Sequence, residues 1–230
     1  MRTLLVLCAA TAVSLAPAPA RAQLVLGARL GWAFPGGKVG EDSAGSSIGM
    51  SELAGGVLPV QVEAGVDAWP DLELSLYASW GPVRPSSQLD ASCAADGVHC
   101  SGYQLRFGIQ TIYVISPSES LPTFRPWLGV GTGLEWMSVR EEAGDRSDTT
   151  AYSGWEVLNL QLGLDLGHGN DDGFEPEGRG GLHWGPFASF ALGQYFHEKR
   201  DLGGSSFDGS IPHRTFHGIL WLGLRGRLGF

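Results

Sequence analysis

Apolar and polar residues alternate in eight segments of the chain after residue 22, and stretches rich in Gly, Pro, Ser and Asp separate these segments. The alternation is clearest at 155–166, where every second residue from Leu158 to Leu166 is leucine and the residues between them are polar or small. Successive side chains of a β-strand point to opposite faces, so this pattern predicts strands with one apolar face. The eight predicted strands are 24–34, 57–68, 72–81, 102–115, 125–138, 155–166, 182–195 and 214–230.

Two features of these segments favour a barrel in a membrane over a soluble barrel or sandwich, whose apolar faces would point inward. The polar faces are rich in glycine and poor in charge, and large aromatic residues such as Trp32, Trp80 and Trp136 collect near segment ends. No apolar run of about 18 residues follows residue 22, which excludes a helical membrane protein. The pattern therefore predicts an all-β fold, an eight-stranded antiparallel up-and-down transmembrane β-barrel. A soluble periplasmic ligand-binding β-barrel is the alternative.

Residues 1–22 have the pattern of an export signal. Arg2 precedes a short apolar run at 4–15, and Ala20-Arg21-Ala22 forms a cleavage site of the A-x-A type. The apolar run is shorter than the roughly 20 residues that a membrane-spanning helix needs. We therefore expect a signal peptide at 1–22 and a single barrel domain at 23–230.

The connectors between the predicted strands differ in length in the way expected of outer-membrane barrels, which have long outside loops and short periplasmic turns. With the N-terminus in the periplasm, the periplasmic turns are 69–71, 116–123 and 167–181, the third being longer and more acidic than the rule expects. The predicted outside loops are 35–56, 82–101, 139–154 and 196–213.

Three stretches carry a resemblance to known proteins: the cleavage site, the run Gly129-Val130-Gly131-Thr132-Gly133, and the alternating ending 222–230. Through them the chain resembles the eight-stranded outer-membrane barrels of the OmpA/OmpX kind. The resemblance implies a bacterial outer-membrane location and a monomer surrounded by lipid and lipopolysaccharide. It also implies an ending that the barrel-insertion machinery recognises, here Leu224, Leu228 and Phe230. It transfers no specific function.

Charged residues at inward positions bear on function, because the interior of an eight-stranded barrel is just wide enough for side chains to fill. Charges in such a space are costly unless they are paired. We therefore expect an internal salt-bridge network and a structural or surface-interaction role, with a narrow pore for small solutes as the alternative. The predicted interior charges are Arg29, Glu63, Glu73, Arg106, Glu135, Asp165, Arg225 and Arg227.

Two cysteines remain after cleavage, Cys93 and Cys100, seven positions apart in a polar stretch. In an exported chain this spacing predicts a disulfide that closes a small loop. The acidic stretch 170–177 has the ligand types of a calcium site, but its spacing does not match an EF-hand loop, so we expect a solvated turn.

The remaining composition excludes some classes of function. The formal net charge of −9 argues against nucleic acid as a partner, because phosphate binding needs a basic surface. His197, Ser205 and Ser206 share one predicted loop, but no His–Ser pair lies on one strand face, as a nucleophile and its base would require. We expect no catalysis, no metal and no cofactor.

Overall fold

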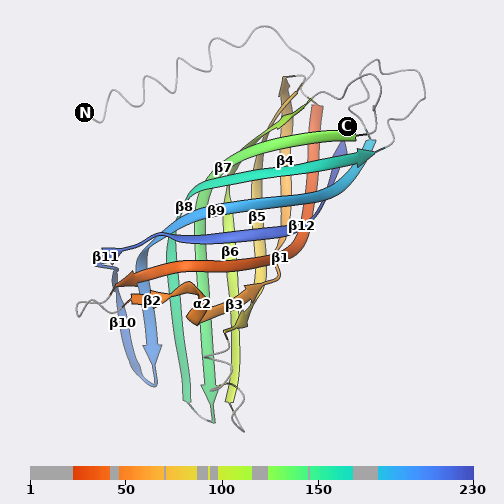
Figure 1. Ribbon diagram of the computed structural model, residues 1–230. Coiled ribbons are helices and arrows are strands. Elements are labelled where there is room, and N and C mark those ends of the chain that lie inside the picture. The colour runs from red at the N-terminus through yellow and green to blue at the C-terminus, as the bar shows by residue number, and fades with distance from the viewer. Residues whose placement is uncertain are drawn as a thin grey trace, which may run out of the picture.

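A computed structural model of the chain describes residues 23–41, 47–69, 71–86, 93, 98–115, 124–144, 146–167 and 181–230. Almost all of them lie in strands of one antiparallel sheet, and one short helix is present (Figure 1). No helix among the described residues has the length and hydropathy needed to cross a membrane. The elements are β1 (Gln23–Glu41), β2 (Ser47–Gly49), α2 (Met50–Leu53), β3 (Ala54–Val57), β4 (Val60–Trp69), β5 (Leu72–Pro85), β6 (Val98–Val114), β7 (Phe124–Ala143), β8 (Arg146–Gly167), β9 (Gly181–Leu202), β10 (Ser205–Ser210), β11 (His213–Arg214) and β12 (His217–Gly229).

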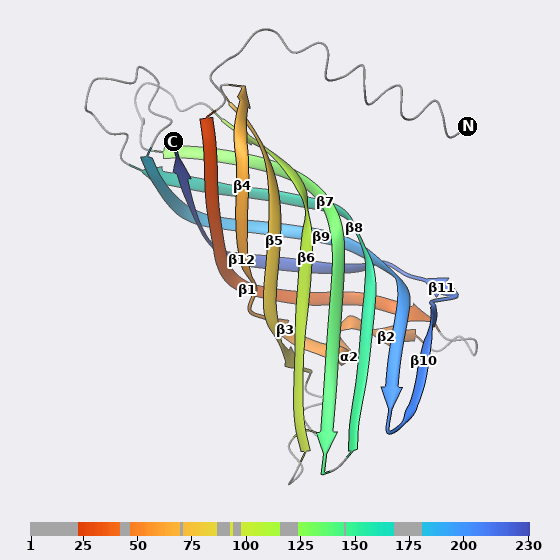
Figure 2. The ribbon, with the colours of Figure 1, turned by 180° about the vertical axis from the view of Figure 1, so that it is seen from behind.

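Eight of these strands close into a ring, whose course Figures 1 and 2 show. β1 pairs with β4, each following strand of the ring pairs with the next, and β12 pairs back with β1. Following cross-strand partners around the ring from Gly27 leads back to β1 at Gly37, ten residues further along. Such a stagger tilts the strands and sets the width of the barrel. The predicted all-β, eight-stranded antiparallel barrel is confirmed.

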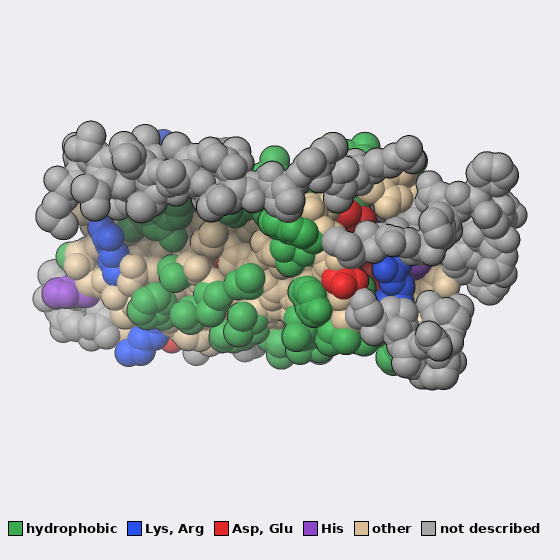
Figure 3. Space-filling model, turned by 90° about the horizontal axis from the view of Figure 1, so that it is seen from above, with side chains coloured by type: hydrophobic (Ala, Val, Ile, Leu, Met, Phe, Trp, Pro, Cys, Tyr) green, Lys and Arg blue, Asp and Glu red, His purple; other side chains and the backbone are tan. Residues whose placement is uncertain are grey.

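The two faces of the ring are as different as the alternation predicts. On the outer face Leu162 and Leu224 are each 58% exposed, whereas on the inner face Glu73 and Arg225 are each 1% exposed. On the face seen in Figure 3, hydrophobic side chains occupy the middle and charged side chains lie toward the two ends. A soluble barrel would have the opposite arrangement, so this exterior is suited to hydrocarbon.

The connectors at one end of the barrel contain much more strand than predicted. This end, opposite the C-terminus, is called here the distal end. β7 and β8 pair up to Ala143 and Arg146, so the predicted loop 139–154 is the tip of a long hairpin. Likewise β9 and β10 pair over most of the predicted loop 196–213. In Figure 2 the strands β6 to β10 extend beyond α2 and β3. Beyond the apolar belt neither face of these hairpins is consistently apolar. The alternation therefore stops there, although the backbone pairing continues.

A short segment that the sequence pattern did not predict packs at the distal end. β2 pairs with the end of β1, and α2 follows it directly. Met50 of α2 is fully buried and belongs to an apolar cluster with inward side chains of the surrounding strands. This distal apolar cluster includes Val39, Met50, Ala54, Val57, Val83, Met137 and Ile211.

A disulfide joins Cys93 and Cys100, whose Cα atoms are 5.6 Å apart. Cys100 lies in β6 near the distal end of the barrel. The predicted signal peptide at 1–22, the turn at 116–123 and the acidic stretch 170–177 lie outside the described residues. Their assignments stay predictions.

Candidate functional site

The structure places all eight predicted interior charges inside the barrel, where each is at most 5% exposed. It places further ionisable side chains there that the prediction did not include as interior charges, namely Asp67, Glu156, His183 and His217. Together with buried Gln, Ser, Tyr and Trp residues they form the barrel's most distinctive chemical feature. The interior is therefore the candidate functional site.

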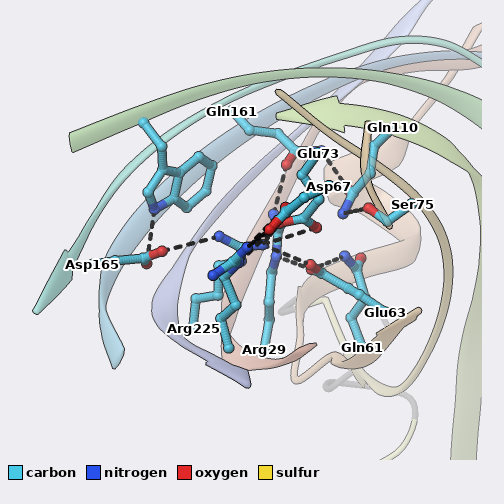
Figure 4. Close-up of polar contacts among 12 residues, drawn as sticks. Arg29, Gln61, Glu63, Asp67, Glu73, Ser75, Gln110, Gln161, Asp165 and Arg225 are labelled. Carbon is cyan, nitrogen blue, oxygen red and sulfur yellow. Dashed lines mark hydrogen bonds and ion pairs between the residues drawn. The ribbon is translucent and has the colours of Figure 1, made fainter. Parts of the chain in front are cut away.

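The first group of charges, the proximal cluster, lies near the C-terminal end of the barrel and is centred on two arginines of β12. Arg225 contacts three carboxylates: its Nη2 lies 3.2 Å from Glu73 and 3.3 Å from Glu63, and its Nη1 lies 3.3 Å from Asp165 (Figure 4). Arg227 lies two residues further on. Its Nη2 donates to Asp67 at 2.9 Å and its Nε donates to Glu73 at 3.1 Å. Glu73 thus joins both arginines.

Arg29 of β1 extends the proximal cluster by pairing with Glu63. Its Nη1 also donates to the side-chain oxygen of Gln161 at 2.8 Å. Gln161 in turn donates to Gln110 at 3.0 Å, and Gln110 donates to Ser75 at 3.1 Å. This chain of contacts crosses the interior from β1 through β8 and β6 to β5 (Figure 4).

An indole packs against the arginines of this cluster. The ring centroid of Trp127 lies 4.8 Å from the guanidinium carbon of Arg225 and 5.3 Å from that of Arg29, within the range of cation–π contacts. Its Nε1 donates to Asp165 at 3.0 Å. Trp127 therefore fills space, satisfies its own donor and covers two cations.

The second group, the distal cluster, is centred on Glu156 of β8, which is fully buried. The two carboxylate oxygens of Glu156 have different donors. Tyr77 donates its hydroxyl to Oε1 at 2.8 Å, and Arg106 donates its Nε to Oε2 at 2.5 Å. Beside this group, Nε2 of His217 lies 2.5 Å from Oε1 of Glu135, and the His217 ring stacks on Tyr195 with centroids 4.2 Å apart.

Glu156 could not be placed inside from the alternation, because even-numbered residues of β8 from Leu158 onward face outward. The pairing of β8 with both neighbours shifts register between Glu156 and Leu158, which marks a β-bulge. A bulge inserts an extra residue and changes which face the following residues occupy. Glu156 is therefore inward while Val157 and Leu160 are exposed. One signal in the sequence does point to Glu156. It is an acidic residue with an even number, like the outward leucines, and it lies two residues before the first of them, Leu158, where the alternation begins.

Glycines on the inner face make room for the large interior side chains. A Cβ added at Gly108 or Gly133 would lie 2.8 or 2.7 Å from the hydroxyl oxygen of Tyr77. A Cβ at Gly193 would lie 2.5 Å from Nε2 of His217 and would also overlap Glu135. The space beside these glycines is thus occupied by neighbouring side chains.

Phe187, which interrupts the polar face of β9, packs edge-on against Trp221, with ring centroids 4.9 Å apart.

The residues considered for catalysis, His197, Ser205 and Ser206, do not assemble into a catalytic group within the described part of the chain. His183 and His217 point into the interior, and His197 lies on the outer part of β9. Nε2 of His197 lies 2.9 Å from Asp208, with both side chains well exposed. Ser205 and Ser206 pair with Leu202 and Asp201 near the β9–β10 turn, away from His197.

The solved structures with a similar fold that are described below are outer-membrane proteins. Neisserial surface protein A aligns with 90% of this chain and 97% of its own, with a TM-score of 0.50 and 13% identity. The chain has the outer-membrane β-barrel fold. Outer membrane protein AlkL, solved in lipid bilayers, aligns with 93% of this chain and 94% of its own, with a TM-score of 0.52 and 12% identity. A major outer membrane protein from Thermus thermophilus covers 91% and 99%, with a TM-score of 0.52 and 15% identity.

These identities are low, so the likeness concerns the fold of the barrel and not its activity. The resemblance to barrels of the OmpA/OmpX kind is confirmed at that level. No protein-family model matches the sequence, and no curated protein matches it.

Proposed function

We propose that this protein is a barrel of the bacterial outer membrane whose interior is closed, and that its role is structural or depends on its distal surface. The observation that carries the proposal is the packing of the interior. Four arginines engage five carboxylates there, and the side chains of Tyr77, Trp127 and His217 lie over inner-face glycines or between the charged groups. A barrel whose inward side chains pair with one another holds its strands in place without conducting.

The outer surface supports the membrane location. Its exposed leucines, valines and aromatic residues form the lipid-facing band that such barrels present to hydrocarbon. Lipid and lipopolysaccharide are the proposed surroundings of this band. The distal end, with its long hairpins, then faces outside the cell. The proposed export signal at 1–22 provides the route to this location.

The proposed insertion signal belongs to the same outer surface. Leu224 and Phe230 are 58% and 62% exposed, and Leu228 faces outward with them. The backbone N–H of Phe230 donates to the carbonyl of Leu24 at 3.0 Å, so the last residue still belongs to the closed ring. We propose that this outward edge is what the insertion machinery contacts.

A conductance measurement tests the closed interior. The mature protein, refolded and checked by a gel shift between unboiled and boiled samples, is inserted into planar lipid bilayers. We expect no discrete current steps. Steps that change in size with Glu135→Gln or Arg106→Gln would overturn the proposal in favour of the narrow pore. A protein that stays folded and monomeric in buffer without detergent would overturn the membrane location.

A further inference from the structure

A pocket of about 380 Å³ lies at the distal end of the barrel, apart from the ionic clusters of the interior. One side of it is formed by the end of β1 and by β2, and the other by the distal parts of β8, β9 and β10. Its volume falls within the range of small-molecule sites. Most of its lining is apolar, with side chains from Val39, Ile48, Leu202, Phe207, Ile211 and Pro212.

Two large apolar side chains of this lining remain accessible. Phe207 is 54% exposed and Leu202 is 44% exposed, and both stand on the β9–β10 hairpin. Hydrophobic side chains on a protruding hairpin that border a concave site are typical of a ligand-binding surface. Together with Ile48 they supply apolar surface for a molecule in the pocket.

A polar pair interrupts the apolar lining on the side formed by β9. Nε of Arg200 donates to Oε1 of Glu198 at 2.6 Å, and the hydroxyl of Tyr152 of β8, which also borders the pocket, interacts with both side chains. The hydrogen bond to Glu198 raises the pKa of Arg200, and burial raises the pKa of Tyr152, so the arginine stays charged and the phenol stays neutral. A guanidinium has five donors and a carboxylate about four acceptor positions, so the pair retains capacity for a ligand beyond its mutual hydrogen bond and its contacts with Tyr152.

The net charge of this pair decides which head group fits. Arg200 would attract an anionic head group and Glu198 would repel it. Glu198 would attract a cationic head group and Arg200 would repel it, so neither sign of charge is favoured. A hydroxyl accepts a hydrogen bond from the guanidinium and donates one to the carboxylate, which uses both partners. The apolar lining contacts the rest of the molecule.

We propose that this pocket binds a small neutral amphiphile, an apolar chain or ring that bears a hydroxyl group, with the hydroxyl on the donors of Arg200 and the acceptor positions of Glu198 that Tyr152 leaves available. The inference rests on the proposed function only in requiring that the distal end be open to the outside. It gives the surface-interaction role a defined chemical class of ligand.

The isoleucines of the chain provide the reporters for a test. Ile48 and Ile211 line the pocket, Ile109 and Ile115 are exposed on the outside of the barrel, and Ile112 and Ile219 are buried in the interior. Protein with ¹³C-labelled isoleucine δ-methyl groups, refolded into phosphatidylcholine nanodiscs, is titrated with octan-1-ol, octanoate or octylammonium at pH 7. Methyl NMR then separates binding in the pocket from partition into lipid.

We expect octan-1-ol to shift the methyl signals of Ile48 and Ile211 saturably and to leave those of Ile112 and Ile219 in place. Hexan-1-ol should bind on the order of tenfold more weakly, because each buried methylene contributes about fourfold to affinity. Octanoate and octylammonium should both bind more weakly than octan-1-ol. Shifts that do not saturate and that follow Ile109 and Ile115 would show partition into lipid only and would overturn the proposal.

Charge-changing variants test the position of the head group. Arg200→Gln leaves Glu198 and should make octylammonium the tightest of the three ligands, whereas Glu198→Gln leaves Arg200 and should favour octanoate. Lys199→Gln, at an exposed neighbouring position that does not line the pocket, is the matched control and should keep the wild-type order. The signals of Ile112 and Ile219 verify the fold of each variant.

An unchanged order of the three ligands in both pocket variants would overturn the head-group assignment, because a merely structural role of Arg200 and Glu198 would weaken all ligands alike. Failure to bind any of them would overturn the inference while leaving the closed interior, which conductance tests separately, intact.

Discussion

Replacing Glu156 with glutamine tests whether the distal cluster holds the barrel together. Glu156 is fully buried and receives hydrogen bonds from Arg106 and Tyr77, and its backbone carbonyl accepts one from Thr132 at 2.8 Å. Glu156→Gln removes the charge with almost no change of shape. Arg106 then keeps its own charge in a space closed to water.

Breaking a buried ion pair by removing one partner costs about 3–5 kcal/mol. We expect a loss near the lower end, about 3 kcal/mol, for two reasons visible in the structure. Glutamine retains an acceptor for the hydroxyl of Tyr77, and Arg106 retains Glu135 as its cross-strand partner on β7. Removing the arginine as well, in Arg106→Met with Glu156→Gln, should return about 2 kcal/mol, because the buried guanidinium that has lost Glu156 is then absent.

Urea unfolding from lipid vesicles, followed by the fluorescence of the tryptophans, measures these differences. Glu142→Gln provides the matched control, since Glu142 pairs with Arg140 at 2.7 Å with half-exposed side chains in the distal β7–β8 hairpin. An exposed pair contributes little, so this variant should stay within about 0.5 kcal/mol of the wild type. Equal effects of Glu156→Gln and Glu142→Gln would refute the reasoning, because burial would then make no difference.

Two further predictions concern the outer surface. Leu162→Arg should destabilise the barrel in vesicles by about 2–4 kcal/mol, because Leu162 lies in the middle of the apolar band, whereas a soluble protein would tolerate arginine at a position 58% exposed. Urea unfolding measures this effect, and no loss of stability would contradict the lipid-facing assignment. Phe230→Ser should reduce the amount of protein recovered in the outer membrane of expressing cells more than the matched change Phe216→Ser, which lies before β12. Equal recovery in membrane fractions would contradict the proposed role of the last residue.

The barrel was predictable because two independent signals agree on it. The alternation of residues such as those at 158–166 assigns one face to each strand, and the even number of segments allows the ring to close. Neither signal depends on details of packing. The strand ends were not predictable in the same way, since the hairpin from Ser138 to Ser153 pairs through its backbone and has no constant apolar face.

The composition of the interior was predictable, but its partners were only partly so. Parity placed Arg225 and Glu73 on inner faces, yet their contact joins β12 to β5, which are not neighbours in the ring. Such pairs depend on the stagger of the ring, which no local pattern contains. The inward position of Glu156 was not predicted, because a bulge inserts one extra residue into β8 and changes which alternate residues face inward.

The role of the interior glycines also required the structure. In the sequence, Gly129, Gly131 and Gly133 suggest space for water or a thin ligand, and so leave a pore open as an alternative. The structure shows that Tyr77 lies against Gly133, and that a Cβ at Gly129 would lie 3.1 Å from the amide oxygen of Gln161. A glycine leaves space beside the backbone, and only the fold shows whether solvent or a neighbouring side chain fills that space.

The interior charges are best understood together with the apolar exterior. An apolar interior of the same volume would be as stable or more so, since buried ion pairs gain little net energy over hydrophobic packing. It would leave both faces of each strand apolar, however. A shift of the pairing register by one residue would then cost little free energy. With Arg225 contacting carboxylates on β4, β5 and β8, a slip of β12 would break these pairs and turn the arginine toward lipid. We therefore propose that the ionic clusters make the register of the barrel specific. On this hypothesis Arg225→Met should raise the fraction of refolded protein without the native gel shift more than its effect on the free energy of unfolding alone would predict.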